Sequence, residues 1–133
     1  MATYYVHKSG NDSNNGLSLG AAKKSIGGAV AAASTGDVIQ VYRGRYNESV
    51  YLPTNTKWNL SLRAIGHVLL DGGGLLADGF YLPMADSAYG FQEIVGFEVA
   101  RFTSRGVALY QIGNGSGNHE QRIKNCHIHH CAN

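Results

Sequence analysis

The chain has little of several features that would define its class. Only two prolines and two cysteines occur among 133 residues, and the formal charge of +2 is close to neutral. Without a cluster of Lys and Arg, the basic stripe that nucleic-acid binding needs is missing, so we expect no nucleic-acid partner. No apolar run reaches the roughly 18 residues of a membrane span, so we expect no membrane partner either. Cys126 and Cys131 are so close in sequence that they make a poor structural disulfide.

The N-terminus also lacks the pattern of a signal peptide. Residues 1–4 have neither the basic nor the apolar region of a secretory leader. The sequence therefore suggests either a protein assembled in the cytoplasm or a mature form whose leader was replaced by Met.

Glycine is abundant, with eighteen residues, and it separates short β-branched runs. Residues 35–50 place a turn at Gly36 and Asp37, a strand at 38–41, a second turn at Gly44 and a new strand within sixteen residues. Similar runs recur at 60–64, 68–70, 80–82, 94–99 and 122–128, and the last two align at an offset of 29 residues. Short strands at a period of roughly 20 to 30 residues are typical of a solenoid.

One helix is expected before these strands. Ser25 is a candidate N-cap, and Ile26, Ala29, Val30 and Ala33 share one face at helical spacing, which predicts a helix over residues 26–34. Gly27 and Gly28 weaken it by about 1 kcal/mol each, so it needs packing to form. We expect it to cover the open end of the first coil.

Several N-terminal motifs together resemble the pectate-lyase-like superfamily of right-handed parallel β-helix proteins. These motifs lie at residues 4–6, 9–16, 24–26, 29–33, 36–37 and 44–48, and residues 123–128 resemble a later coil. The superfamily contains secreted polysaccharide lyases and hydrolases as well as phage tailspikes and fibres. Virion proteins are made in the cytoplasm and released by lysis, so within this superfamily the missing leader favours a phage virion component, with an extracellular protein as the alternative. The resemblance implies an all-β, right-handed parallel β-helix with a short N-terminal capping helix.

The length sets the size of this predicted fold. At roughly 20 to 30 residues a coil, the chain makes about four to five coils in a single domain. Residues 1–36 would hold the first strand, a loop and the helix, and residues 37–133 the coils. The last coil looks unfinished, so we expect one of two arrangements. Either the chain is the N-terminal part of a longer protein, or its last edge is covered by other copies in a homo-oligomer, such as a trimer, or by other virion proteins.

Carboxylates are the candidates for catalysis. Glycoside hydrolysis needs a pair of acids, and β-helix lyases commonly need acids for calcium together with a Lys or Arg base. Asp71, Asp78 and Glu98 are carboxylates that stacked strands could bring together. No residue matches the family's catalytic base, so we expect no catalysis within these 133 residues.

Aromatic side chains suggest recognition instead. Tyr42, Tyr46, Tyr51 and Trp58 follow one another closely, and exposed rings stack on sugar faces. We therefore expect a non-catalytic structural or polysaccharide-recognising module. The alternative is the N-terminal portion of a polysaccharide lyase or glycoside hydrolase whose active site lies beyond residue 133.

Two segments contain metal-ligand residue types. Residues 126–131 hold two cysteines and three histidines, but strand alternation sends Cys126 and Ile128 to one face and His127 and His129 to the other. We expect Cys126 to pack inward, the histidines to be solvated and no zinc to bind. Residues 11–16 resemble half of a calcium loop, but Lys23 stands where the bidentate Glu would be, so Asx turns are favoured and calcium is only a candidate ion.

Overall fold

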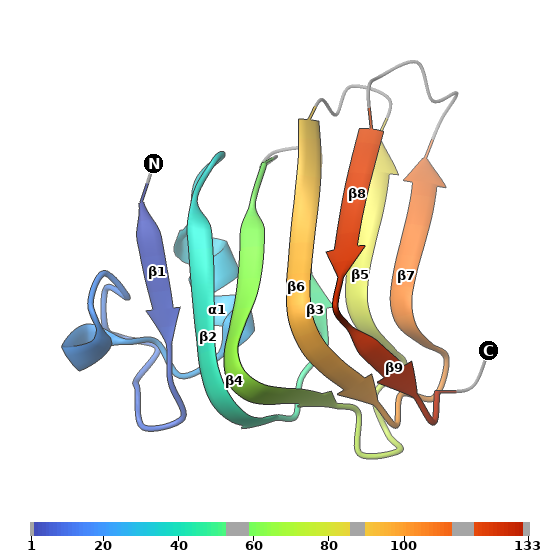
Figure 1. Ribbon diagram of the computed structural model, residues 1–133, viewed down its shortest axis with the longest axis horizontal. Coiled ribbons are helices and arrows are strands. Elements are labelled where there is room, and N and C mark those ends of the chain that lie inside the picture. Colours follow the sequence, from blue (N-terminus) through green and yellow to red (C-terminus); the bar gives the residue numbers. More distant parts are fainter. Residues whose placement is uncertain (1, 53–58, 86–89, 113–118, 132–133) are drawn as a thin grey trace.

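The computed structural model describes residues 2–52, 59–85, 90–112 and 119–131, and nearly all of its regular structure is parallel β-sheet (Figure 1). The large sheet contains β1 (Thr3–Val6), β2 (Val38–Tyr46), β4 (Ser61–Asp71), β6 (Gly90–Ala100) and β8 (His119–Lys124) in that order, and β9 (His127–His129) also pairs with β6. The small sheet contains β3 (Val50–Tyr51), β5 (Asp78–Ala85) and β7 (Arg105–Ile112). The chain alternates between the two sheets.

Successive strands of the large sheet stack in parallel, as the sequence predicts. Ile39 of β2 lies beside Leu62 of β4, which lies beside Ile94 of β6. Each of these side chains is buried, because it faces the small sheet. Phe80 and Phe97 meet edge to face between the sheets, with ring centroids 5.2 Å apart. The parallel pairs place like residues on adjacent strands, and the apolar ones form the core.

The predicted right-handed parallel β-helix of four to five coils is wrong, because the described residues form two separate parallel sheets and no closed solenoid. Segments 60–64 and 68–70, expected as two strands, are one strand, β4, that bends between its halves. The stretches 72–77 and 101–104 contain turns and bends and no strand, although backbone hydrogen bonds join them, as from the Thr103 amide to the Leu76 carbonyl at 2.8 Å.

The predicted helix is present as α1 (Ile26–Ala32). The Ser25 hydroxyl caps it by accepting a hydrogen bond from the Gly28 amide at 3.0 Å, and Ile26, Ala29 and Val30 are buried. The Glu48 carboxylate accepts hydrogen bonds from the Ile26 and Gly27 amides, which ties the helix start to the chain after β2. The helix packs against β1, β2 and β3. No helix among the described residues is long and apolar enough to cross a membrane.

The outer edge of β1 is hydrogen-bonded by the loop that follows it. The Tyr5 amide donates to the Gly16 carbonyl, and the Lys23 amide donates to the Tyr5 carbonyl. The Lys23 ammonium in turn donates to the Asp12 and Asn14 carbonyls, at 2.9 and 2.7 Å, and so holds the loop in place. This loop occupies the backbone groups that an edge strand otherwise offers to another chain.

Strands β2, β4 and β6 of the large sheet bend sharply towards their C-terminal ends (Figure 1). The bend lies where the pairing register shifts, between Tyr42 and Gly44 in β2 and between Arg63 and Val68 in β4. Gly66 and Gly96 have positive φ angles of 79° and 84°, which residues with a Cβ rarely adopt. We call residues 44–46, 68–71 and 97–100, together with β9, the bent end of the sheet.

Gly96→Ala is expected to lower the free energy of unfolding by about 1 to 2 kcal/mol, because an L-residue is strained at positive φ. Urea denaturation followed by circular dichroism measures this change. Gly20→Ala is the control, since a Cβ there meets no atom within 4 Å and Gly20 is not among the glycines with positive φ. Equal stability of the two variants would contradict the strain.

Candidate functional site

The outer face of the bent end carries one of the polar clusters that the fold brings together. Another joins Glu93 of β6 to Ser61 and Arg63 of β4 and to Lys124 of β8. The parallel register places Arg45 beside Leu69, Leu69 beside Glu98, and Glu98 beside His127. Because side chains alternate along a strand, the following positions, Tyr46, Leu70 and Val99, point inward and are at most 1% exposed. The core side of this segment is thus apolar, and the outer side is charged.

Two adjoining hollows on this face share Arg45 and Leu69, and we call them together the outer groove. The first has a volume of about 530 Å³ and is lined by Arg43, Gly44, Arg45, Gly66, His67 and Leu69. The second has a volume of about 320 Å³ and is lined by Arg45, Leu69, Asp71, Glu98, Ala100, Arg101, His129 and His130. Both volumes lie in the range of small-ligand sites.

Asp71 lies at one end of the groove and is held there by several hydrogen bonds and ion pairs. Its side chain has no exposed surface. Arg101 Nε donates to Oδ1 at 2.9 Å, the Gly73 amide donates to the same oxygen at 2.8 Å, and Arg45 Nε lies 2.5 Å from Oδ2. The hydrogen bonds from Arg101, supported by Gly73 and Arg45, lower the pKa of Asp71 to about 2. This carboxylate is therefore ionised at neutral pH and holds two guanidinium groups in place.

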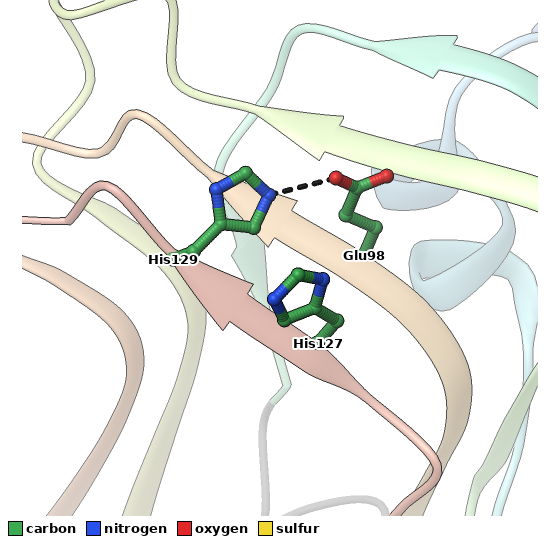
Figure 2. A group of neighbouring side chains, drawn as sticks. All are labelled: Glu98, His127 and His129. Atoms are coloured by element: carbon green, nitrogen blue, oxygen red, sulfur yellow. Dashed lines mark hydrogen bonds and ion pairs between the residues drawn. The ribbon is translucent and has the colours of Figure 1, made fainter.

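Glu98 is the centre of a second cluster, formed with His67 of β4 and with two histidines of β9, His127 and His129. Figure 2 shows Glu98 with the two histidines of β9. His129 Nε2 lies 2.7 Å from Glu98 Oε1, and His67 Nε2 contacts the other carboxylate oxygen. The His127 ring lies beside that of His129, with centroids 4.5 Å apart. Hydrogen bonds from His129 and then His67 lower the pKa of Glu98, so this carboxylate is also ionised at neutral pH.

The structure brings two of the three predicted carboxylates into one groove. Asp71 and Glu98 line the same hollow. Asp78 begins β5 of the small sheet, where its Oδ1 lies 3.5 Å from Arg105 Nε. Neither of these two atoms has a hydrogen-bond partner among the described residues. Asp78 is thus outside the outer groove.

The predicted aromatic residues do not form one surface. Tyr46 is buried, its hydroxyl donates to the Tyr42 carbonyl at 2.7 Å, and burial raises its pKa to about 12, so its ring is not available to a sugar. Tyr42 is partly buried and packs near Tyr5, with ring centroids 6.4 Å apart. Tyr51 is 54% exposed and stacks on Tyr81 of the small sheet at 5.7 Å. Trp58 lies outside the described residues.

The two segments with metal-ligand residue types also differ in outcome. Cys126 packs against the core, as predicted. His127 and His129 share the opposite face, where His127 is exposed as predicted, whereas His129 is partly buried and bonds to Glu98. In the N-terminal loop, Asn11 Oδ1 accepts from the Ser13 amide and hydroxyl at 2.9 and 2.7 Å, which confirms an Asx turn there.

The Glu98 and Asp71 clusters are the features that sequence reasoning missed. Arg43, Arg101 and His67 belong to no short motif, and Arg45 lies in segment 44–48, which carried only the family resemblance, so nothing local marked them as site residues. The 29-residue offset between 94–99 and 123–128 is the signal that could have found one pair, because it aligns Glu98 with His127.

Comparisons of the chain with protein-family models, with curated proteins and with solved structures gave no match. The chemistry of the outer groove therefore carries the functional conclusion.

Asp71→Asn is expected to lower the free energy of unfolding by about 1 to 3 kcal/mol at pH 7, since it leaves two arginines without their shared anion. The lower part of this range applies if the arginines, which are 50 to 60% exposed, regain water. Because the folded-state pKa is lowered to about 2 from an unfolded value of about 3.9, the stabilisation is present above pH 4. It is lost as the pH falls towards 2.

Urea denaturation of both proteins at a series of pH values between 7 and 2 measures this difference. Asp78→Asn, which removes an acid facing one arginine, is the matched control and should cost less. A stability difference for Asp71→Asn that stays constant down to pH 2 would show that the ion pairs are not its cause.

Proposed function

We propose that this chain is a non-catalytic recognition module that binds an acidic oligosaccharide in the outer groove. The observation that carries the proposal is Arg43. Its side chain is exposed on the groove, and no acidic partner lies within ion-pair distance of it in the part of the chain that the structure describes. An exposed guanidinium that lines a groove and faces no anion is suited to bind one from a ligand.

The charge around Arg43 is positive even though the chain as a whole is nearly neutral. Arg45 lines the same hollow, and Lys8 lies against Gly44, where a Cβ would come within 2.5 Å of Lys8 Cγ. The acids around this group already have partners. Asp71 is shared between Arg45 and Arg101, and Glu98 contacts His67 and His129. Glu48, whose charge acts on Lys8, accepts hydrogen bonds from the first amides of α1. The excess positive charge at this end therefore favours an anionic ligand.

The shape of the groove favours a sugar over a simple anion. Leu69 gives it an apolar floor, and Gly44 and Gly66 leave the backbone without side chains beside the arginines. A pyranose ring offers an apolar face to such a floor, while its carboxylate or sulfate group accepts paired hydrogen bonds from a guanidinium. An acidic oligosaccharide combines both features.

The carboxylates of the groove support binding rather than hydrolysis. Glycoside hydrolysis needs one carboxyl group that keeps its proton near neutral pH. Hydrogen bonds from Arg101 and from His129 lower the pKa values of Asp71 and Glu98, respectively. Both groups are therefore anions that orient their neighbours, and neither can donate a proton to a leaving group.

Arg43→Ala is expected to weaken binding of an oligogalacturonate by about tenfold to a hundredfold, which corresponds to a hydrogen-bonded charge pair. Isothermal titration calorimetry measures the affinity, and a neutral galacto-oligosaccharide of equal length should bind much more weakly to the wild type. Affinity for the acidic sugar should fall as salt rises.

Lys24→Ala is the matched control, because it removes one positive charge from an exposed side chain that does not line the groove. Equal affinities of the two variants, or equal affinities for the acidic and neutral sugars, would contradict the proposal. If inorganic sulfate bound as tightly as the oligosaccharide, the groove would be an anion site without sugar recognition, which would also contradict the proposal. Shortened or unsaturated sugar products, detected by mass spectrometry, would favour the alternative lyase or hydrolase function.

A further inference from the structure

The bent end of the large sheet brings three metal-ligand side chains from two strands to one point. Glu98 lies on β6, and His127 and His129 lie on β9, which pairs with β6 in parallel. One ligand atom from each of the three lies within 4.8 Å of the other two (Figure 2). We propose that Glu98, His127 and His129 bind a divalent transition-metal ion of the zinc type.

The donor set fits such an ion. Two imidazole nitrogens and one carboxylate oxygen are ligands that zinc accepts in open sites, and imidazole disfavours calcium and magnesium. Ligand atoms around a tetrahedral zinc ion are about 3.3 Å apart, given bond lengths near 2 Å. His129 Nε2 and Glu98 Oε1 are 2.7 Å apart, so they need to separate by only about half an ångström.

Neighbouring side chains hold these ligands in position. His67 of β4 contacts the Glu98 oxygen that does not face His129, and His130 Nδ1 contacts His129 Nδ1. Groups that bind the far atom of a ligand fix its orientation and raise metal affinity. His67 is therefore a positioning residue, and it leaves Glu98 Oε1 and His129 Nε2 directed at the same point.

The cysteines of the same segment do not complete the site. Cys126 Sγ donates to the Lys124 carbonyl at 3.3 Å, and Cys131 Sγ donates to the His129 carbonyl at 3.4 Å. Both cysteines pack against the core, whereas the histidines lie on the outer face. Three ligands leave a coordination position for water or for a ligand atom.

An ion can reach the three ligands without unfolding of the sheet. The side chains of Glu98 and His129 are 25% and 28% exposed, and His127 is exposed. Glu98 and His129 also line the smaller hollow of the outer groove. The proposed ion would thus add positive charge beside the groove, but its binding does not depend on the saccharide proposal.

The test is titration of the full chain with zinc chloride by calorimetry and with cobalt chloride by visible absorption. We expect a single ion per chain, a cobalt spectrum typical of nitrogen and oxygen ligands, and no heat from calcium or magnesium. His129→Ala should weaken zinc binding by more than about a hundredfold, because loss of a ligand costs more than loss of a supporting group. Glu98→Gln, which keeps the side-chain size, is a second variant in case the first fails to fold.

Two histidine variants separate the proposed roles. His7→Ala is the control, since His7 lies near Tyr42 outside the cluster, and it should bind zinc like the wild type. His67→Ala should bind zinc about tenfold to a hundredfold more weakly but with the same cobalt spectrum, because the ligands are unchanged. Equal zinc affinity of the wild type, His129→Ala and Glu98→Gln would overturn the site, as would one ion bound per two chains.

Discussion

The parallel register between β4, β6 and β9 is the constraint on which the rest of the molecule depends. Backbone pairing places Leu69, Glu98 and His127 on adjacent strands and turns Leu70, Val99 and Ile128 to the other face. A slip of one residue would put Glu98 into the core and Val99 into the groove, with a large cost for the buried carboxylate. Leu70 and Val99 are buried and so fix the positions of Leu69 and Glu98, whereas His127 is placed by the pairing of β9 with β6. The same strand pairing therefore determines both the packing of the core and the geometry of the site.

Much of the local structure could be predicted from the sequence, but the architecture could not. Ser25 followed by apolar residues at helical spacing identifies α1, and β-branched runs identify β2, β4 and β6. One error lies at the bend of β4, where Gly66 and His67 suggest a turn between two strands, although the chain there continues as a single strand. Whether sheets close on themselves depends on contacts between distant segments, which glycine positions and apolar periodicity do not encode. The phage-virion setting and an oligomeric state stay predictions.

The candidate site was less predictable for a different reason. Single carboxylates were visible, but their partners lie about 30 residues away along the chain, as Arg101 does from Asp71 and His129 from Glu98. Whether an acid is a proton donor or a fixed anion depends on those partners, so the sequence left the roles of Asp71 and Glu98 open. For the aromatic residues the sequence suggested a sugar-binding role that Tyr46 does not have, because its side chain points inward and packs in the core. Only the 29-residue alignment carried information across strands.

The loop that hydrogen-bonds the outer edge of β1 closes that edge of the large sheet to other strands. Gly16 and Lys23 already occupy the backbone groups on that edge, so a strand from another copy cannot pair there without displacing the loop. Lys23 and its carbonyl partners make that displacement costly. Strand exchange between copies is thus disfavoured at β1, and on this side the large sheet has a border that is closed to further strands.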